Sequence, residues 1–190
     1  MEESIKSRYQ VDHVESGLPR WLIEAAFVCL LAQAAISWSP TMTWMENHAR
    51  WAIAVIQTFG SLVMYVGLLR GMKPLYRPFC VWWHLIIALN VAGFVVEFPS
   101  FIPDALRLAV AISLLLVYLP LGALLTVFYR GRLRQVGLWM ALYILVSAIV
   151  PVLWFLAGAS DSGLPNILVE ASTIGVTIVY AWVLRRILVA

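Results

Sequence analysis

The chain has 190 residues, of which 63% are hydrophobic and 12% are charged, and its mean hydropathy is +0.90. Soluble domains carry about a quarter charged residues, so this composition excludes an ordinary soluble domain and predicts an integral membrane protein. The net charge is only +3 and the basic residues are scattered between apolar segments, which argues against nucleic-acid binding.

Residues 1–19 mix acidic and basic side chains, and we interpret them as a polar cytoplasmic tail rather than a signal peptide. The pattern leaves open whether this tail is ordered. Residues 20–190 are predicted to form one transmembrane domain. Six apolar segments, each near the roughly 20 residues that cross a bilayer, can be drawn in it. They are residues 20–38, 50–69, 78–98, 105–129, 135–158 and 164–184.

These segments are continuously apolar rather than alternating, and only helices and closed barrels satisfy the backbone in lipid. We therefore expect an all-α bundle of six transmembrane helices. Prolines fall near the middle of the fourth and fifth helices, at Pro120 and Pro151, where each would free a backbone carbonyl. Residues 41–49 are expected to be a loop on the outer side.

The basic residues predict the orientation of the bundle. All lysines and arginines except Arg50 and Arg107 fall on one side of a six-helix path, so the positive-inside rule places both termini in the cytoplasm. The layout resembles that of small bacterial inner-membrane proteins, and we expect that location. The basic residues of the two cytoplasmic turns are Arg70, Lys73, Arg77, Arg130, Arg132 and Arg134.

Tryptophans lie near the ends of the predicted segments and none lies at a segment centre. This distribution is typical of the aromatic belts at the two membrane surfaces. Trp82 and Trp83, which open the third segment, are therefore predicted to anchor that helix at the cytoplasmic surface.

Polar side chains inside the first three segments are candidate functional residues, because such groups usually face other helices or a wet cavity. At 1.5 Å per residue, Glu24 and His84 lie at matching depths, and Gln33 and Asn90 both lie near the midplane. We predict that the first and third helices pack through a polar seam of these four residues, with Gln57 beside it. The alternative is structural, with the amides joining helices and Glu24 reaching the cytoplasmic surface.

Charged residues also gather near the outer ends of the helices. Arg107 lies about one turn into the fourth helix and is predicted to pair with Glu97 or Glu170, close to Asp104. An anionic mouth that attracts cations and a set of solvated helix ends are both compatible with this outer charged cluster.

No catalytic motif is present: the sequence has no Walker loop, no HExxH and no GxSxG. His84 is the only histidine within a predicted helix, so one chain cannot supply two axial haem ligands. The two cysteines, Cys29 and Cys80, lie at different depths and predict no disulfide or metal site. We expect no catalytic residues, no metal and no cofactor.

These features favour a non-enzymatic membrane subunit, sensor or scaffold. It would assemble with itself or with a protein partner on the cytoplasmic face, where the basic turns would also meet anionic lipid. The alternative is a small-solute transporter or channel, or the substrate-binding subunit of a transporter, that uses the polar seam. A third possibility is a lipid-modifying or redox membrane enzyme built on His84 and Glu24.

Overall fold

The computed structural model describes residues 10–36, 39–72, 77–97, 103–146 and 163–189. Within them the chain is all-helical, as the continuously apolar segments predict, and it forms no strand. The six helices described are α2 (Arg20–Ile36), α3 (Ser39–Met72), α4 (Arg77–Glu97), α5 (Asp104–Phe128), α6 (Arg132–Ile144) and α8 (Gly163–Leu188).

Three helical stretches among the described residues are long and apolar enough to cross a membrane: Ala54–Met72, Ala109–Phe128 and Glu170–Leu188. Large apolar side chains also cover the outside of the bundle. On α5, for example, Leu116 is 67% exposed and Val127 is 76% exposed. Such a surface suits contact with lipid and would be a liability in water.

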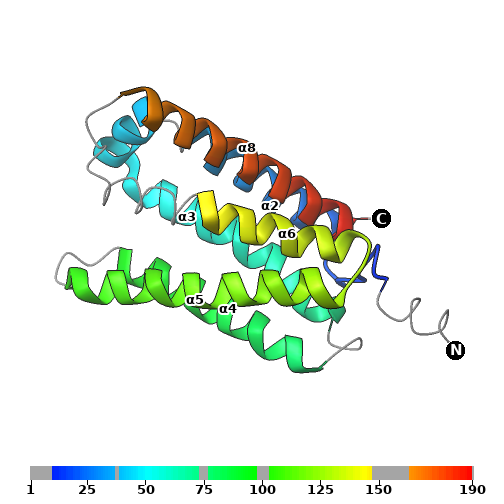
Figure 1. The fold of residues 1–190 in the computed structure, drawn as a ribbon. Coiled ribbons are helices and arrows are strands. Elements are labelled where there is room, and N and C mark those ends of the chain that lie inside the picture. The colour runs from blue at the N-terminus through cyan, green and yellow to red at the C-terminus, as the bar shows by residue number, and fades with distance from the viewer. Residues whose placement is uncertain (1–9, 37–38, 73–76, 98–102, 147–162, 190) are drawn as a thin grey trace, which may run out of the picture.

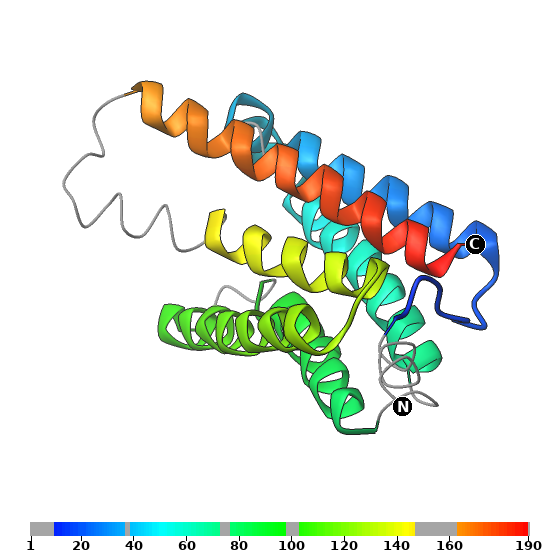
Figure 2. The ribbon, with the colours of Figure 1, turned by 45° about the vertical axis from the view of Figure 1, so that its right-hand side comes forward.

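The helices form a closed ring, because each packs against the next along the chain and α8 packs against both α6 and α2 (Figures 1 and 2). Only two to six residues separate successive helices from α2 to α6, and helices joined by such short connections pack side by side. The turn between α5 and α6 contains Gly131, whose φ of 71° is a conformation that side chains rarely adopt. α3 and α8 also touch across the ring.

One predicted loop is wrong. Residues 41–49 are helical and belong to α3, which begins at Ser39 rather than near residue 50. Ser39 followed by Pro40 is a favourable helix start, and no glycine or proline interrupts the stretch up to Gly60. The second half of the fifth predicted segment, including Pro151, lies outside the described residues, whereas Pro120 lies inside α5 as expected.

A packed hydrophobic core fills one half of the ring. Trp83 belongs to it: the indole is fully buried and its Nε1 donates a hydrogen bond to Sδ of Met72 at 3.2 Å. The prediction that Trp83 anchors the helix at the membrane surface is therefore wrong, while Trp82 packs only partly against the core. Consecutive residues of a helix point about 100° apart, so two adjacent tryptophans cannot face the same surroundings.

Residues 10–19, which we call the N-terminal strap, are ordered and lie across the end of this packed half (Figure 2). The amide of Val14 donates to the carbonyl oxygen of Ile187 at 2.9 Å, and the amide of Leu133 donates to the carbonyl oxygen of Val11 at 3.0 Å. Val11 and Val14 are buried. The strap thus joins the end of α8 to the start of α6.

Glycines let α5 and α6 approach closely. A Cβ added at Gly137 would lie 2.6 Å from the carbonyl oxygen of Gly122 and 2.6 Å from Cβ of Leu125. No flexible side chain can yield there, because both atoms belong to or adjoin the backbone of α5. Gly175 on α8 is different, since an added Cβ would meet no atom within 4 Å.

Gly137→Ala should therefore lower the thermal unfolding midpoint of the purified protein, with a loss of about 1–3 kcal/mol from overpacking. Gly175→Ala is the matched control, and it should leave the midpoint unchanged or raise it, because alanine favours helix over glycine by up to about 1 kcal/mol. Equal midpoints for the two variants would contradict the close α5–α6 contact.

Candidate functional site

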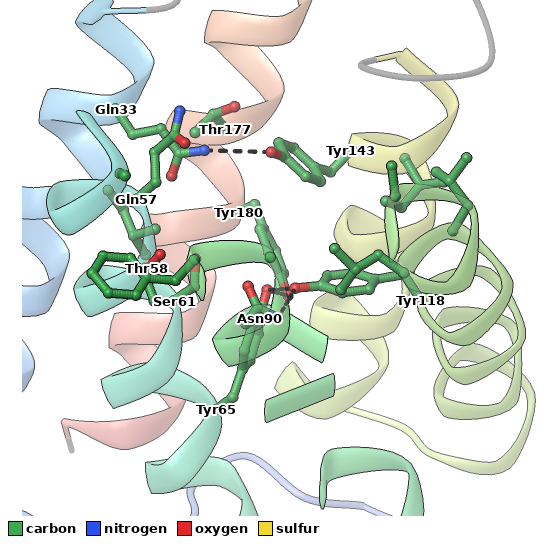
Figure 3. A pocket seen from close by; sticks show the side chains of 18 residues that line it. Gln33, Gln57, Thr58, Ser61, Tyr65, Asn90, Tyr118, Tyr143, Thr177 and Tyr180 are labelled. Atoms are coloured by element: carbon green, nitrogen blue, oxygen red, sulfur yellow. Dashed lines mark hydrogen bonds between the residues drawn. The ribbon is translucent and has the colours of Figure 1, made fainter. Parts of the chain in front are cut away.

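A cavity of about 390 Å³ occupies the other half of the ring (Figure 3). Its volume falls within the range of small-molecule sites. All six described helices contribute to its wall. The lining residues are Leu30, Gln33, Ala54, Gln57, Thr58, Ser61, Tyr65, Asn90, Gly93, Phe94, Ala111, Leu114, Leu115, Tyr118, Tyr143, Ile144, Thr177 and Tyr180.

Ten of these lining side chains are polar, and none of the described ones is charged. They comprise four tyrosines, three amides and three aliphatic hydroxyls. Polar groups cost free energy in an apolar interior unless they are hydrogen-bonded. Their concentration around one cavity therefore marks that cavity as the candidate site. The ten are Gln33, Gln57, Thr58, Ser61, Tyr65, Asn90, Tyr118, Tyr143, Thr177 and Tyr180.

Three tyrosine hydroxyls meet at one end of the cavity, and we call Tyr65, Tyr118 and Tyr180 the tyrosine cluster. The Tyr118 hydroxyl donates to the Tyr65 hydroxyl at 2.9 Å, and the Tyr180 hydroxyl donates to the same oxygen at 3.3 Å. Nδ2 of Asn90 donates to the Tyr118 hydroxyl at 3.1 Å and to the carbonyl oxygen of Ile86 at 2.8 Å. Figure 3 shows these groups converging.

Aromatic packing holds the cluster in place. The rings of Tyr65 and Tyr118 meet edge to face with centroids 5.8 Å apart. The centroids of the Tyr65 and Trp83 rings are also 5.8 Å apart. Such pairs are worth roughly 0.5–1.5 kcal/mol beyond burial alone. The hydroxyls are therefore presented to the cavity by rings that have little freedom to move.

A second polar contact lies further along the cavity. Nε2 of Gln33 donates to the Tyr143 hydroxyl at 3.4 Å, and the Tyr143 ring stacks on that of Tyr180 with centroids 6.0 Å apart. Gln57 and Thr177 lie near Gln33 in Figure 3. This contact links α2 to α6 across the hollow part of the ring.

The tyrosine cluster separates the cavity from the packed core. Met64 and Leu68 on α3 and Leu121 and Leu125 on α5 lie on the side of the N-terminal strap and are fully buried. A close-packed interior of this kind holds few voids as large as a water molecule. The cavity is thus closed toward the strap.

Three predicted seam residues, Gln33, Gln57 and Asn90, do line this one cavity. The seam itself was placed wrongly, because α2 packs mainly against α3 and α8, whereas α4 packs mainly against α3 and α5. The first and third predicted helices are therefore not direct partners. The three amides line one cavity instead of lying along a contact between two helices.

The predicted Glu24–His84 pair is not formed. Glu24 is held by Arg185 of α8, whose Nε and NH2 donate to the two carboxylate oxygens at 2.7 Å each. Nε of Arg20, one turn earlier on α2, lies 3.7 Å from Oε1 of Glu24. His84 lies on the exposed side of α4, with Nδ1 2.6 Å from the carbonyl oxygen of Cys80. Neither Glu24 nor His84 lines the cavity.

The outer charged cluster stays a prediction. The side chains of Glu97, Asp104 and Arg107 lie outside the described part of the structure, and the described Glu170 is partly buried on α8.

The described arginines of the basic turns lie at the end of the bundle that carries the strap. Arg132 is tied down there, because its amide donates to Oδ1 of Asp12 at 3.2 Å and its NH1 donates to the carbonyl oxygen of Arg186 at 2.8 Å. The side chains of Arg70, Arg130 and Arg134 are exposed there. Lys73 and the side chain of Arg77 lie outside the described residues.

The four cavity tyrosines were not predicted from the sequence. Tyrosines of membrane proteins usually lie at the membrane surfaces, where the hydroxyl reaches water. Tyr65, Tyr118 and Tyr180 instead lie well inside apolar stretches. That position was the available signal, because a hydroxyl far from water needs a polar partner.

Among the described residues, no group of three or more histidine, cysteine, aspartate and glutamate side chains could hold a metal ion. Cys29 and Cys80 are both free. Comparisons with known protein families, curated proteins and solved structures find no match for this chain.

The Glu24–Arg185 pair generates a prediction for stability. In a double-mutant cycle with Glu24→Gln and Arg185→Gln, the two substitutions should be non-additive by about 1 kcal/mol, since the ion pair is partly exposed. The measurement is thermal unfolding of the purified protein. The matched cycle of Glu24→Gln with His84→Gln should be additive. The observed pairing would be contradicted if the Glu24 and His84 substitutions were non-additive while the Glu24 and Arg185 substitutions were additive.

Proposed function

We propose that the protein is a membrane protein that binds a small, neutral, hydrogen-bonding solute in the cavity, as the substrate-binding unit of a transport or sensing system. The observation that carries this proposal is the polar, uncharged lining of a cavity of about 390 Å³ within an apolar bundle. Polar residues at such positions are expensive to keep and usually mark a functional path or site.

The unpaired state of several lining groups supports binding over a purely structural role. Amides that only join helices would bond to one another across a helix contact. Instead, Gln57, Thr58 and Ser61 make no side-chain hydrogen bond to any other described residue and face the same cavity. These α3 groups remain available to a solute.

The lining also indicates the charge of the solute. An ion transferred into an apolar interior needs an opposite charge or a dense shell of ligands, and no described lining residue is charged. Aromatic rings from four tyrosines and Phe94 offer flat apolar faces beside the hydroxyls and amides. A neutral molecule with both polar and apolar parts fits such a wall.

We further propose that six helices cross the membrane with the strap end in the cytoplasm. The support is the concentration of exposed arginines at that end, among them Arg70, Arg130 and Arg134, together with the positive-inside rule. In this orientation the packed core faces the cytoplasm. The solute then enters the cavity from the outer side.

The exposed arginines also support assembly with a cytoplasmic partner. A binding unit that is closed toward the cytoplasm depends on other subunits to pass on its solute or its signal. The scaffold or subunit role expected from the sequence and the solute-binding role are therefore compatible. We place solute binding before the scaffold role, because the polar cavity is a more specific feature than the exposed arginines.

Cysteine labelling tests the proposed orientation. In a variant with Cys29 and Cys80 replaced by serine, a cysteine at position 161, between α6 and α8, should react with an impermeant maleimide added outside intact cells. Arg134→Cys in the same background should react only after the membrane is opened. The reverse pattern would contradict a cytoplasmic strap.

A thermal-shift screen tests solute binding. Neutral alcohols, amides, sugars and nucleosides should include ligands that stabilise the purified protein, by about 2.7 kcal/mol at a concentration one hundred times the dissociation constant. Thr58→Val should weaken their binding about fivefold, since one hydrogen bond is lost. Thr126→Val, on α5 outside the cavity, is the matched control and should change nothing.

Two outcomes would contradict the proposal. One is a screen in which only charged compounds stabilise the protein. The other is a set of neutral ligands whose affinities are the same in Thr58→Val and in the parent protein.

A further inference from the structure

The tyrosine cluster and Asn90, which we call the floor of the cavity, have a hydrogen-bonding capacity that the described residues do not use. Tyr65, Tyr118 and Tyr180 are 3%, 6% and 5% exposed, so all three side chains are buried in the bundle. Their hydroxyls share two contacts, from Tyr118 to Tyr65 and from Tyr180 to Tyr65. Three O–H protons cannot all be used in two contacts, however each hydroxyl rotates.

One O–H donor of the tyrosine cluster is therefore left over. Because Tyr118 donates to Tyr65 and either of Tyr65 and Tyr180 can donate to the other, the spare proton belongs to Tyr65 or to Tyr180. No other described residue accepts it. Both tyrosines line the cavity, so this donor is available to whatever occupies that space.

Asn90 supplies a spare acceptor beside this donor. The carbonyl oxygen of Ile86 can only accept, so the group of Asn90 that faces it at 2.8 Å must be Nδ2. The second hydrogen of Nδ2 is directed at the Tyr118 hydroxyl at 3.1 Å. Both amide hydrogens are then used, and Oδ1 of Asn90 has no donor among the described residues.

From this donor–acceptor pair we infer that the cavity recognises a neutral group that both accepts and donates a hydrogen bond, which means an alcohol hydroxyl or an amide of the solute. The inference rests on the proposed solute-binding function and names its chemistry. A hydroxyl of the tyrosine cluster donates to the oxygen of the solute, and Oδ1 of Asn90 accepts the hydrogen of the solute.

Other groups fit this floor less well. A carboxylate or an ether oxygen can only accept, so it leaves Oδ1 of Asn90 facing another oxygen. An ammonium group can only donate, so it leaves the spare tyrosine proton without an acceptor. Sites built to pair with a hydroxyl or amide reject analogues that lack one hydrogen bond, because a buried polar group is left unpaired.

Matched probes test this inference directly. Benzyl alcohol and benzyl methyl ether share the ring and the oxygen, but the ether lacks the hydrogen that Asn90 would accept. We expect the purified protein to bind the alcohol about tenfold more tightly than the ether, with dissociation constants measured by NMR or thermal titration. Benzamide should likewise bind more tightly than N,N-dimethylbenzamide.

Variants then assign the preference to particular atoms. Asn90→Leu should abolish the alcohol-over-ether ratio, and comparison with the parent protein cancels the steric effect of the extra methyl group. Tyr65→Phe should change the affinities for alcohol and ether by the same factor, because both probes use an oxygen to accept from the cluster. Thr126→Val is the control: Thr126 lies on α5 outside the cavity, so both affinities and their ratio should stay unchanged.

The results separate this inference from the proposed function. Equal affinities for alcohol and ether in the parent protein would overturn the inference even if Asn90→Leu fails to fold, and would assign the spare donor and acceptor to bound water. Absence of binding by every probe would overturn it as well. The proposed function would survive either result if the solute screen yields other neutral ligands that Thr58→Val weakens.

Discussion

The tyrosine cluster is the constraint on which the rest of the bundle depends, because it marks where close packing stops. Toward the strap, apolar side chains such as Leu68 and Leu121 are fully buried inside the ring. Away from the strap, the lining changes to amides, hydroxyls and small residues, and a cavity remains. Three phenolic rings can serve both halves, since each ring packs in the core while its hydroxyl faces the hollow side.

The packed half gives the cavity a rigid base. The Glu24–Arg185 pair fixes α2 to α8, the glycines at positions 122 and 137 bring α5 onto α6, and the strap joins α6 to the end of α8. None of these contacts touches the cavity. Together they hold the helices from which the lining residues project, and a preorganised site loses less entropy when it binds.

Composition and apolar length were enough to predict an all-helical chain and to find Gln33, Gln57 and Asn90. Depth along a helix can be counted from sequence, but the neighbour of a helix and the direction of a side chain cannot. Glu24 and His84 matched in depth, yet Glu24 faces Arg185, which is distant in sequence. The identity of neighbouring helices is a tertiary property.

The two predicted seam residues of α4 do not share a helix face. His84 and Asn90 are six residues apart, which at 100° per residue places them 120° apart around the helix, so they could not share one seam. Trp83, Ile86 and Asn90 follow the i, i+3, i+7 spacing of a single helix face, and they do point inward together. That stripe, and the tyrosines inside apolar segments, were the signals of the cavity floor.

The asymmetry between the two halves bears on how a solute would be used. A carrier that exposes its site alternately to each side must open a path through the packed half, where side chains from several helices are fully buried. Close-packed cores are bistable only where two discrete packings exist. The N-terminal strap adds backbone hydrogen bonds and two buried valines to that closed end. This arrangement favours a one-sided binding unit that works with a partner over a carrier that transports alone.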